Sequence, residues 1–154
     1  MRRSKDISAG ILAFRRKAGL EVLLAHPGGP FWAKKDDGAW TIPKGLVETD
    51  DDLASTARRE FREETNLVVA GALFALAPVN QKSGKIVHAF AVDADFDLDQ
   101  FASNEFEIEW PPKSGRRKRF PEIDRVAYFS LPVAAVKIVA YQRPLLEELE
   151  RRLK

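Results

Sequence analysis

The segment GLVETDDDLASTARREFREETN, residues 45–66, constrains this chain more than any other because it crowds acidic side chains into one turn and one helix. The helix is expected to run from about Asp52 to Thr65. Like charges at helical spacing repel one another by a few tenths of a kcal/mol per pair, so another interaction must offset the repulsion. Solvent, arginine partners and a bound cation are the three candidates.

A helical wheel helps to weigh these candidates. At about 100° per residue, Glu60, Glu63 and Glu64 share one narrow face, which borders the apolar stripe around Phe61. The arginines of the helix take the far side: Arg58, Arg59 and Arg62. A solvated helix with internal Arg–Glu pairs is the simpler interpretation, but an inward carboxylate without a partner costs several kcal/mol of desolvation. Oxygen ligands clustered on a rigid helix therefore favour a hard divalent cation such as Mg²⁺.

The same segment resembles the signature box of the Nudix hydrolases, the family of MutT-like pyrophosphohydrolases. That box reads Gly, five residues, Glu, seven residues, and then Arg-Glu-apolar-x-Glu-Glu-x-Gly-apolar. Here it begins at Gly45 and closes with REFREETNL, residues 59–67, and two positions depart from it: Asp51 replaces Glu, and Asn66 replaces Gly. Asn tolerates a left-handed backbone better than most residues with a side chain, so we expect Asn66 to end the helix in that conformation.

The resemblance extends over nearly the whole chain and implies one α/β domain, residues 1–154. Its expected fold is the Nudix α/β/α sandwich, with a mixed central sheet between the box helix and a terminal helix. The implied activity is Mg²⁺-dependent cleavage of a pyrophosphate bond, with Mn²⁺ as an alternative metal. The implied substrates are nucleoside diphosphate derivatives such as nucleoside triphosphates or dinucleoside polyphosphates, and the subfamily stays open. A catalytically silent module that binds a nucleotide or RNA is the alternative function.

The resemblance also assigns roles to residues of the box. Glu63 and Glu64 would bind the metal together with the carbonyl oxygen of Gly45. Glu60 would be a further ligand or the general base, and Arg59 would orient it through a charge-assisted pair. Which carboxylate acts as the base stays open.

A further metal ligand is expected from outside the box, on a loop before a late strand. Glu122 in FPEIDRVAYF occupies such a position, and an ordinary exposed loop residue is the alternative interpretation. Its rivals are Glu107 and Glu109 in FEIEW.

Three residues are candidates for substrate binding. Lys44 immediately precedes the box and could contact a phosphate as a mobile point charge. Trp32 and Lys34 lie in the loop GGPFWAKKDDG, where an aromatic face and nearby cations suit a base and a phosphate chain. The basic run at residues 116–119 could guide polyphosphate or the 5′ end of an RNA, although such runs are usually solvated loops.

The rest of the chain predicts strands with few helices. Strands are expected at residues 8–26 as a hairpin, 39–43, 66–79, 84–96 and 103–110. Residues 113–131 are expected to form a basic loop that leads into a last strand, and residues 132–154 one or two terminal helices.

Composition excludes several classes of protein. The chain has no cysteine, so disulfides and thiolate metal sites are ruled out. Its net charge of +2 is too small to argue for nucleic acid on its own. No apolar run is long enough to cross a bilayer, and the start MRRSKDISAGILAF lacks the pattern of a signal peptide. A cytoplasmic protein that does not enter membranes is expected, and its oligomeric state stays open.

Overall fold

The computed structural model describes residues 6–48 and 51–154. Within these residues the strands are β1 (Ile7–Arg16), β2 (Leu20–Pro27), β3 (Lys44–Leu46), β4 (Phe74–Ala75), β5 (Val79–Asn80), β6 (Ile86–Asp93), β7 (Glu105–Glu109), β8 (Arg117–Pro121) and β9 (Ile123–Ser130). The helices are α1 (Leu53–Thr65), α2 (Leu131–Lys137) and α3 (Arg143–Arg152), with short 3₁₀ helices η2 (Leu98–Gln100) and η3 (Ala140–Gln142).

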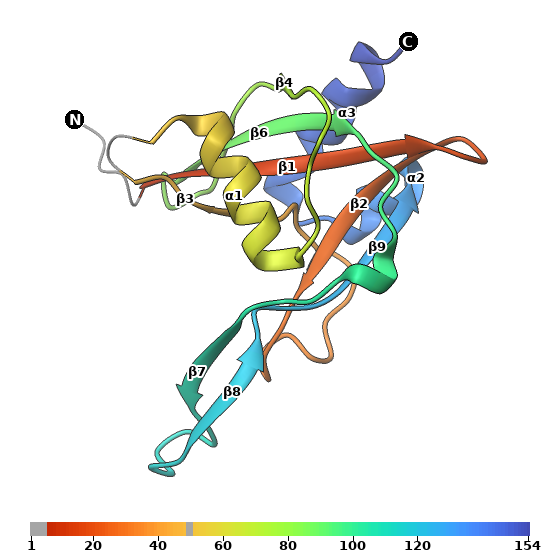
Figure 1. Ribbon diagram of the computed structural model, residues 1–154. Helices are drawn as coiled ribbons and strands as arrows, with labels where there is room; N and C mark the ends of the chain where they lie inside the picture. Colours follow the sequence, from red (N-terminus) through yellow and green to blue (C-terminus); the bar gives the residue numbers. More distant parts are fainter. Residues whose placement is uncertain (1–5, 49–50) are drawn as a thin grey trace.

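One mixed sheet organises the fold (Figure 1). Its seven strands follow the order β4-β6-β1-β2-β9, with β3 paired to β1 and β5 paired to β6. Strands β1 and β6 run parallel, and the other pairs are antiparallel. Helix α1 lies on one face of the sheet and helices α2 and α3 lie on the other (Figure 1). The predicted α/β fold with a mixed central sheet is confirmed.

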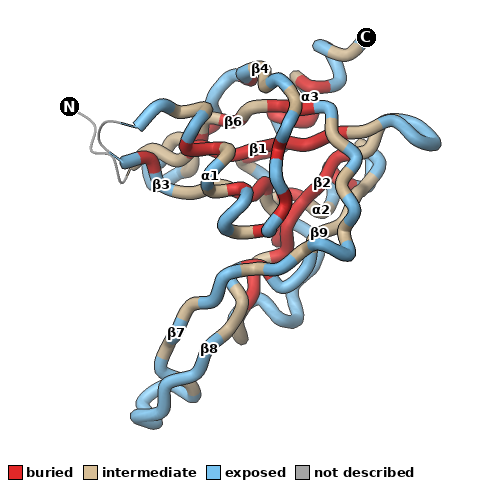
Figure 2. The backbone as a smooth tube through the Cα atoms, viewed as in Figure 1, coloured by how far each residue is buried: buried red, intermediate tan, exposed pale blue. Residues whose placement is uncertain are grey.

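Strand β1 lies at the centre of the sheet, and both of its faces are therefore buried (Figure 2). Leu12 and Phe14 point into the core under α2 and α3, while Ile11 and Ala13 point into the core under α1. A strand that is covered on both faces has a nearly continuous apolar sequence, as GILAF does here. Phe61 of α1 is completely buried against this second face and fixes the orientation of the helix.

The ends of α1 follow the sequence closely. Asp52 caps the first turn, where its carboxylate accepts a hydrogen bond from the Ser55 N–H at 2.9 Å. Asn66 has a φ of 65°, and its N–H donates to the Arg62 carbonyl at 2.8 Å. The helix predicted from about Asp52 to Thr65, and the left-handed residue at its end, are both confirmed.

Three of the predicted elements are wrong in part. Residues 39–43 do not form a strand: Trp40 and Thr41 make isolated bridges, and the strand beside β1 begins at Lys44. Residues 66–79 contain only the two-residue strand β4 and the first residue of β5, because the segment arches over the sheet rather than joining it at length. Residues 117–121, predicted as a loop, form β8, because acidic residues of β7 face their basic side chains across the hairpin.

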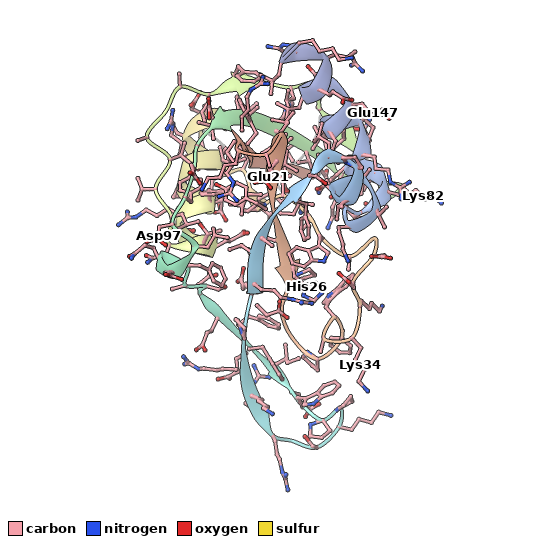
Figure 3. The ribbon with its side chains drawn as sticks, turned by 90° about the vertical axis from the view of Figure 1, so that its right-hand side faces the viewer. Glu21, His26, Lys34, Lys82, Asp97 and Glu147 are labelled. Atoms are coloured by element: carbon pink, nitrogen blue, oxygen red, sulfur yellow. The ribbon has the colours of Figure 1, made fainter. Side chains whose placement is uncertain are left out.

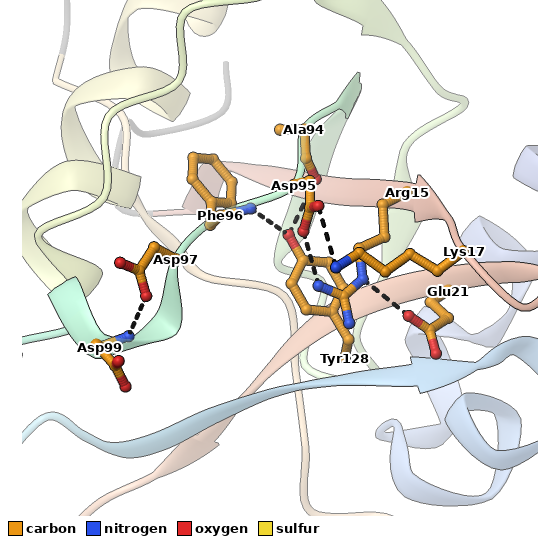
Figure 4. Close-up of polar contacts among 9 residues, drawn as sticks. All are labelled: Arg15, Lys17, Glu21, Ala94, Asp95, Phe96, Asp97, Asp99 and Tyr128. Atoms are coloured by element: carbon orange, nitrogen blue, oxygen red, sulfur yellow. Dashed lines mark hydrogen bonds and ion pairs between the residues drawn. The ribbon is translucent and has the colours of Figure 1, made fainter.

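A polar network fastens the segment after β6 to the sheet (Figure 4). Arg15 donates to Glu21 at 2.8 Å and to Asp95 at 2.7 Å, and its guanidinium lies over the ring of Tyr128. The Tyr128 hydroxyl donates to the carbonyl of Ala94 at 2.9 Å. The network therefore joins β1, β2 and β9 at the edge where the chain leaves the sheet toward β7. None of the described helices is both long and apolar enough to pass through a membrane.

Candidate active site

Strand β3 brings the start of the acidic segment against α1. Its register with β1 places Gly45 opposite Ala9, at the sheet edge that α1 covers. A Cβ atom on Gly45 would collide with the carboxylate of Glu60. Glycine is required here because it lets the backbone approach the helix at the level of that carboxylate.

A cavity of about 520 Å³ opens beside this contact. Its walls come from β1, β3, α1, the turn between β5 and β6, and the junction of β8 with β9. The lining residues are Ser8, Lys44, Gly45, Leu46, Glu48, Glu60, Glu64, Gln81, Lys85, Val87 and Glu122. Four carboxylates, those of Glu48, Glu60, Glu64 and Glu122, therefore share one cavity with two lysines.

Burial and the repulsion of neighbouring carboxylates raise the pKa values of Glu60, Glu64 and Glu122. Burial raises the pKa of Glu64 to about 8, and the charges of Glu60 and Glu122 add to the rise. The ammonium and the backbone N–H of Lys44 act in the opposite direction but do not offset it. Glu64 lies on the helix face that was expected to border the apolar stripe, and its half-buried position agrees with that.

The pKa values of Glu60 and Glu122 are raised, like that of Glu64. Burial raises the pKa of Glu60, with a further contribution from the charge of Glu63, while Arg59 lowers it. Desolvation also raises the pKa of Glu122 at the rim of the cavity, again with a contribution from Glu63. The carboxylates of the helix and Glu122 thus lie close enough to disfavour one another's charge.

The same surroundings affect the pKa of Lys44. Burial lowers the pKa of Lys44; Glu64 raises it, and the neighbouring charge of Lys85 lowers it further. Two cations in a hollow that also holds carboxylates suit a ligand with several negative charges of its own, such as a phosphate chain.

A second, smaller pocket of about 200 Å³ adjoins the first, and the two share Lys44 and Gln81. Its remaining walls are Pro27, Trp32, Ala39, Thr41, Val139 and Tyr141. Trp32 is 40% exposed, and the ammonium of Lys35 lies 5.0 Å from the centre of its ring. The pair of pockets joins a carboxylate and lysine region to a region with aromatic walls.

Comparison with known proteins identifies the family. The NUDIX domain matches residues 4–149 of the chain. The chain belongs to the Nudix family. A search of curated proteins found no match.

Solved structures share the fold of this Nudix chain. An Ap4A hydrolase from C. elegans in a binary complex has a TM-score of 0.66 and 22% identity, with 95% of this chain and 97% of that chain covered. The NUDIX domain of Shewanella oneidensis NrtR complexed with ADP ribose has a TM-score of 0.65 and 18% identity, with 99% and 91% covered. A MutT protein from Methanosarcina mazei Go1 has a TM-score of 0.61 and 23% identity, with 96% and 94% covered. Identities this low establish the fold alone.

Arg59, the arginine of the Nudix box, contacts acidic residues that the helical wheel did not place beside it. Although Arg59 leaves the helix on its exposed side, its guanidinium lies 3.1 Å from Asp51, 3.4 Å from Glu60 and 3.8 Å from Glu63. Glu63 is exposed and lines a hollow on the outer side of α1 rather than the cavity of Glu60 and Glu64. In the described part of the chain, no three His, Asp or Glu side chains stand ready to hold a metal ion.

The rival carboxylates lie elsewhere in the Nudix fold. Glu107 pairs with Arg117 at 3.0 Å, and Glu109 accepts hydrogen bonds from the N–H groups of Lys113 and Gly115 at 3.1 and 3.0 Å. Both residues are on the hairpin of β7 and β8 and do not line the cavity, whereas Glu122 does.

Two further predictions concern the loop that follows β2. Trp32 lines the second pocket, but Lys34 lines neither pocket and extends from the outer edge of the loop (Figure 3). His26, at the end of β2, fixes this loop: its Nε2 donates to the Lys35 carbonyl at 2.6 Å, and its Nδ1 lies 2.9 Å from Asp124. Of the two lysines in this loop, Lys35 lies beside the ring of Trp32.

Sequence reasoning missed Gln81, Lys85 and Tyr141. The first two flank the turn KSG, which joins β5 to β6 with the Gln81 N–H donating to the Lys85 carbonyl at 2.8 Å. The turn signal was present in the sequence, but nothing local indicated that this turn lies beside Gly45. Tyr141 lies in η3, where its hydroxyl accepts a hydrogen bond from Gln142 at 2.9 Å.

Proposed function

We propose that this protein is a Mg²⁺-dependent pyrophosphohydrolase that acts on nucleoside diphosphate derivatives. The observation that carries the proposal is the single cavity in which Glu60 and Glu64 of the box meet Glu122 from outside it, beside Lys44 and Lys85. Membership of the Nudix family supports the reaction class, since its box supplies the first two of these residues.

The donor set fits a hard divalent cation. Carboxylate oxygens of Glu60, Glu64 and Glu122, with the carbonyl oxygen of Gly45 and Glu63 nearby, are the ligand type that Mg²⁺ prefers. Burial, with the neighbouring charges of Glu60 and Glu122, raises the pKa of Glu64, and a bound cation would offset this cost of ionisation. Among the residues that the structure describes, three of these carboxylates do not gather at one point. A bound cation would neutralise phosphate charge and lower the pKa of water.

The other roles belong to groups of the chain itself. Lys44 and Lys85 would hold the phosphate chain through charge. Glu60 would accept a proton from the attacking water, for which a pKa raised toward neutrality is suitable. Arg59, 3.4 Å from Glu60, would orient that carboxylate. The pocket with Trp32 and Tyr141 would take the nucleoside, whose base packs well against aromatic rings.

A substrate panel tests this proposal. Nucleoside triphosphates, dinucleoside polyphosphates and ADP-ribose are incubated with Mg²⁺, with Mn²⁺ or with EDTA, and the products are identified by chromatography. The proposal expects metal-dependent release of a nucleoside monophosphate from at least one class and none with EDTA.

The same panel includes Glu64→Gln as the matched control for contaminating enzymes. Turnover that survives this change in full would not come from the proposed site. Binding of a nucleotide without turnover across the whole panel would replace the proposal with the binding-module alternative.

A further inference from the structure

The hairpin of β7 and β8 protrudes from the body of the molecule and lies outside both apolar cores (Figures 1 and 2). It is nevertheless tied to the loop that carries Trp32. The N–H of Gly28 donates to the carbonyl of Glu122 at 2.8 Å, and the rings of Phe31 and Trp110 meet edge to face at 5.4 Å. The hairpin and this loop therefore form one continuous surface beside the second pocket.

The register of the hairpin separates two faces of different character. Phe106 lies opposite Phe120, and Ile108 lies opposite Lys118. Strand side chains alternate, so these residues share one face with Trp110, and that face turns toward the loop, where Phe106 is next to Gly29. The other face carries Glu105, Glu107 and Glu109 together with Arg117 and Arg119, which pair with Glu105 and Glu107.

The acidic residues of the hairpin are already engaged. Glu107 pairs with Arg117 at 3.0 Å and with Arg119 at 3.7 Å, and Glu109 closes the turn through two backbone N–H groups. Among the residues that the structure describes, no carboxylate lies within ion-pair distance of Arg116 or Lys118. The face toward the loop thus keeps its positive charge, while the opposite face is neutralised.

Exposed aromatic rings accompany these cations. Phe31 is 64% exposed although it contacts Trp110, and Trp32 next to it is 40% exposed. Lys35 lies over the ring of Trp32, and Lys118 lies 5.5 Å from the centre of Phe120. Stacking platforms alternating with cations are how proteins hold the bases and phosphates of a single strand.

We propose that the surface formed by Phe31, Trp110, Arg116 and Lys118, here called the hairpin ledge, binds single-stranded RNA. Bases stack on Phe31, and phosphates contact Lys118 and Arg116. The ledge is continuous with the second pocket through Trp32, and that pocket shares Lys44 with the carboxylate cavity. RNA, unlike DNA, begins with a 5′ chain of phosphate anhydrides, so the choice of RNA rests on the proposed function. The binding itself requires no turnover.

Fluorescence anisotropy tests the ledge independently of hydrolysis. The probe is an eight-nucleotide single-stranded RNA with a 5′-hydroxyl and a 3′ fluorescein, titrated in EDTA at several salt concentrations. Phe31→Ala is expected to weaken binding about five-fold or more, from the usual contribution of one stacked base. Phe31→Trp should restore it. Lys118→Gln should weaken binding and lower the salt slope by about 0.7, the value for one phosphate contact on a single strand.

Arg117→Gln is the matched control because it removes the same charge one residue away, on the opposite face of the same strand. It should leave affinity within two-fold of the parent. Equal weakening by Lys118→Gln and Arg117→Gln would overturn the proposal, since binding would then follow net charge alone. The proposal would also be overturned if the RNA probe did not bind at low salt. It would be overturned as well if polyphosphate, which has no bases, displaced the probe as strongly as unlabelled RNA does. DNA of the same sequence offers the same bases and phosphates to the ledge, so the assignment to RNA is tested with a 5′-triphosphate RNA, which should bind more tightly than the 5′-hydroxyl probe. Equal affinity of these two RNAs would remove the assignment.

These outcomes are separate from those of the substrate panel. RNA binding in EDTA without turnover of any nucleotide would contradict the proposed hydrolase and leave the ledge intact. Turnover of nucleotides by a chain that does not bind the RNA probe would do the reverse.

Discussion

The box helix α1 and the hairpin of β7 and β8 use the same two residue types, glutamate and arginine, with opposite results. On the hairpin, cross-strand register sets Glu107 directly opposite Arg119, and the exposed pairs neutralise each other. On α1, Glu60 and Glu64 turn into a shared cavity where burial and like charge raise their pKa values. Exposed pairs of this kind contribute at most about 1 kcal/mol, whereas the crowded set costs free energy.

The difference lies in what the arginines of α1 do. Arg58 is committed to the backbone, donating to the carbonyls of Val69 and Gly71 at 2.9 Å each. Arg59 pairs with Asp51, Glu60 and Glu63 but does not line the cavity. No arginine of the helix lines the cavity. The positive charge that acts on Glu64 there is that of Lys44. Carboxylates without a matching cation in a concave site indicate a place where a ligand binds. Carboxylates paired with arginines on an exposed hairpin indicate a structural role.

The sharpest test of this contrast is removal of one charge from each region. Glu64→Gln is expected to lower turnover by about 100-fold or more, equivalent to roughly 2.7 kcal/mol of activation free energy, because a negative metal ligand is lost. Glu63→Gln should also remove most of the turnover. Glu107→Gln is the hairpin control and should match the parent. Initial rates at limiting Mg²⁺ make the measurement, and near-normal rates in both box variants would refute the metal site.

A smaller effect is expected from the carboxylate outside the box. Glu122→Gln should lower kcat by roughly ten-fold, about 1.4 kcal/mol of barrier. Glu107→Gln and Glu109→Gln should change it little, since the structure places both on the hairpin. Steady-state kinetics at saturating substrate compare the three variants. A crippled Glu107→Gln beside an unaffected Glu122→Gln would reverse the assignment.

The two regions should also differ in how stability depends on pH. The pKa of Glu64 is about 8 in the fold and near the ordinary 4.5 in the unfolded chain, so between these values the folded state binds the extra proton. Stability of the metal-free protein should therefore fall as pH rises from about 5 to 8. Tm measured in EDTA by thermal melts should show this fall, and Glu64→Gln should flatten it.

Glu107→Gln provides the comparison and should leave the slope unchanged. Mg²⁺ should raise Tm more at pH 8 than at pH 6, because protonated carboxylates bind the cation poorly. A parent protein whose Tm is independent of pH in this window would contradict the crowding of Glu64.

The smallest expected effect concerns two positive-φ residues, one in each region: Asn66 at the end of α1 and Lys113 in the hairpin turn. Asn66→Gly should be nearly neutral, since glycine favours this backbone but loses the hydrogen bond from the side chain to Gln100. Asn66→Val should cost about 1 kcal/mol or more because a β-branched residue resists positive φ. Lys113→Gly should be neutral or stabilising.

Thermal melts of the three variants rank these effects. A valine variant at position 66 that melts at or above the parent would show that the left-handed conformation is not needed there.

Local patterns predicted the parts of the fold that local interactions hold. The helix from about Asp52 to Thr65, the left-handed Asn66 and the inward face of α1 all follow from helical geometry within a few residues. The segment at residues 66–79 and the strand β8 were mispredicted, because strand formation depends on a partner that lies elsewhere in the chain.

The sequence by itself determined the family, the box helix and the side of that helix from which Glu60 and Glu64 point. Only the tertiary structure decided which distant groups meet them. Pairing of β9 with β2 fixes the junction that carries Glu122, and pairing of β5 with β6 brings the turn with Lys85 to the same cavity. A helix sets its own geometry through bonds four residues apart, whereas sheet neighbours are set by contacts across the whole chain. No local pattern encodes that choice.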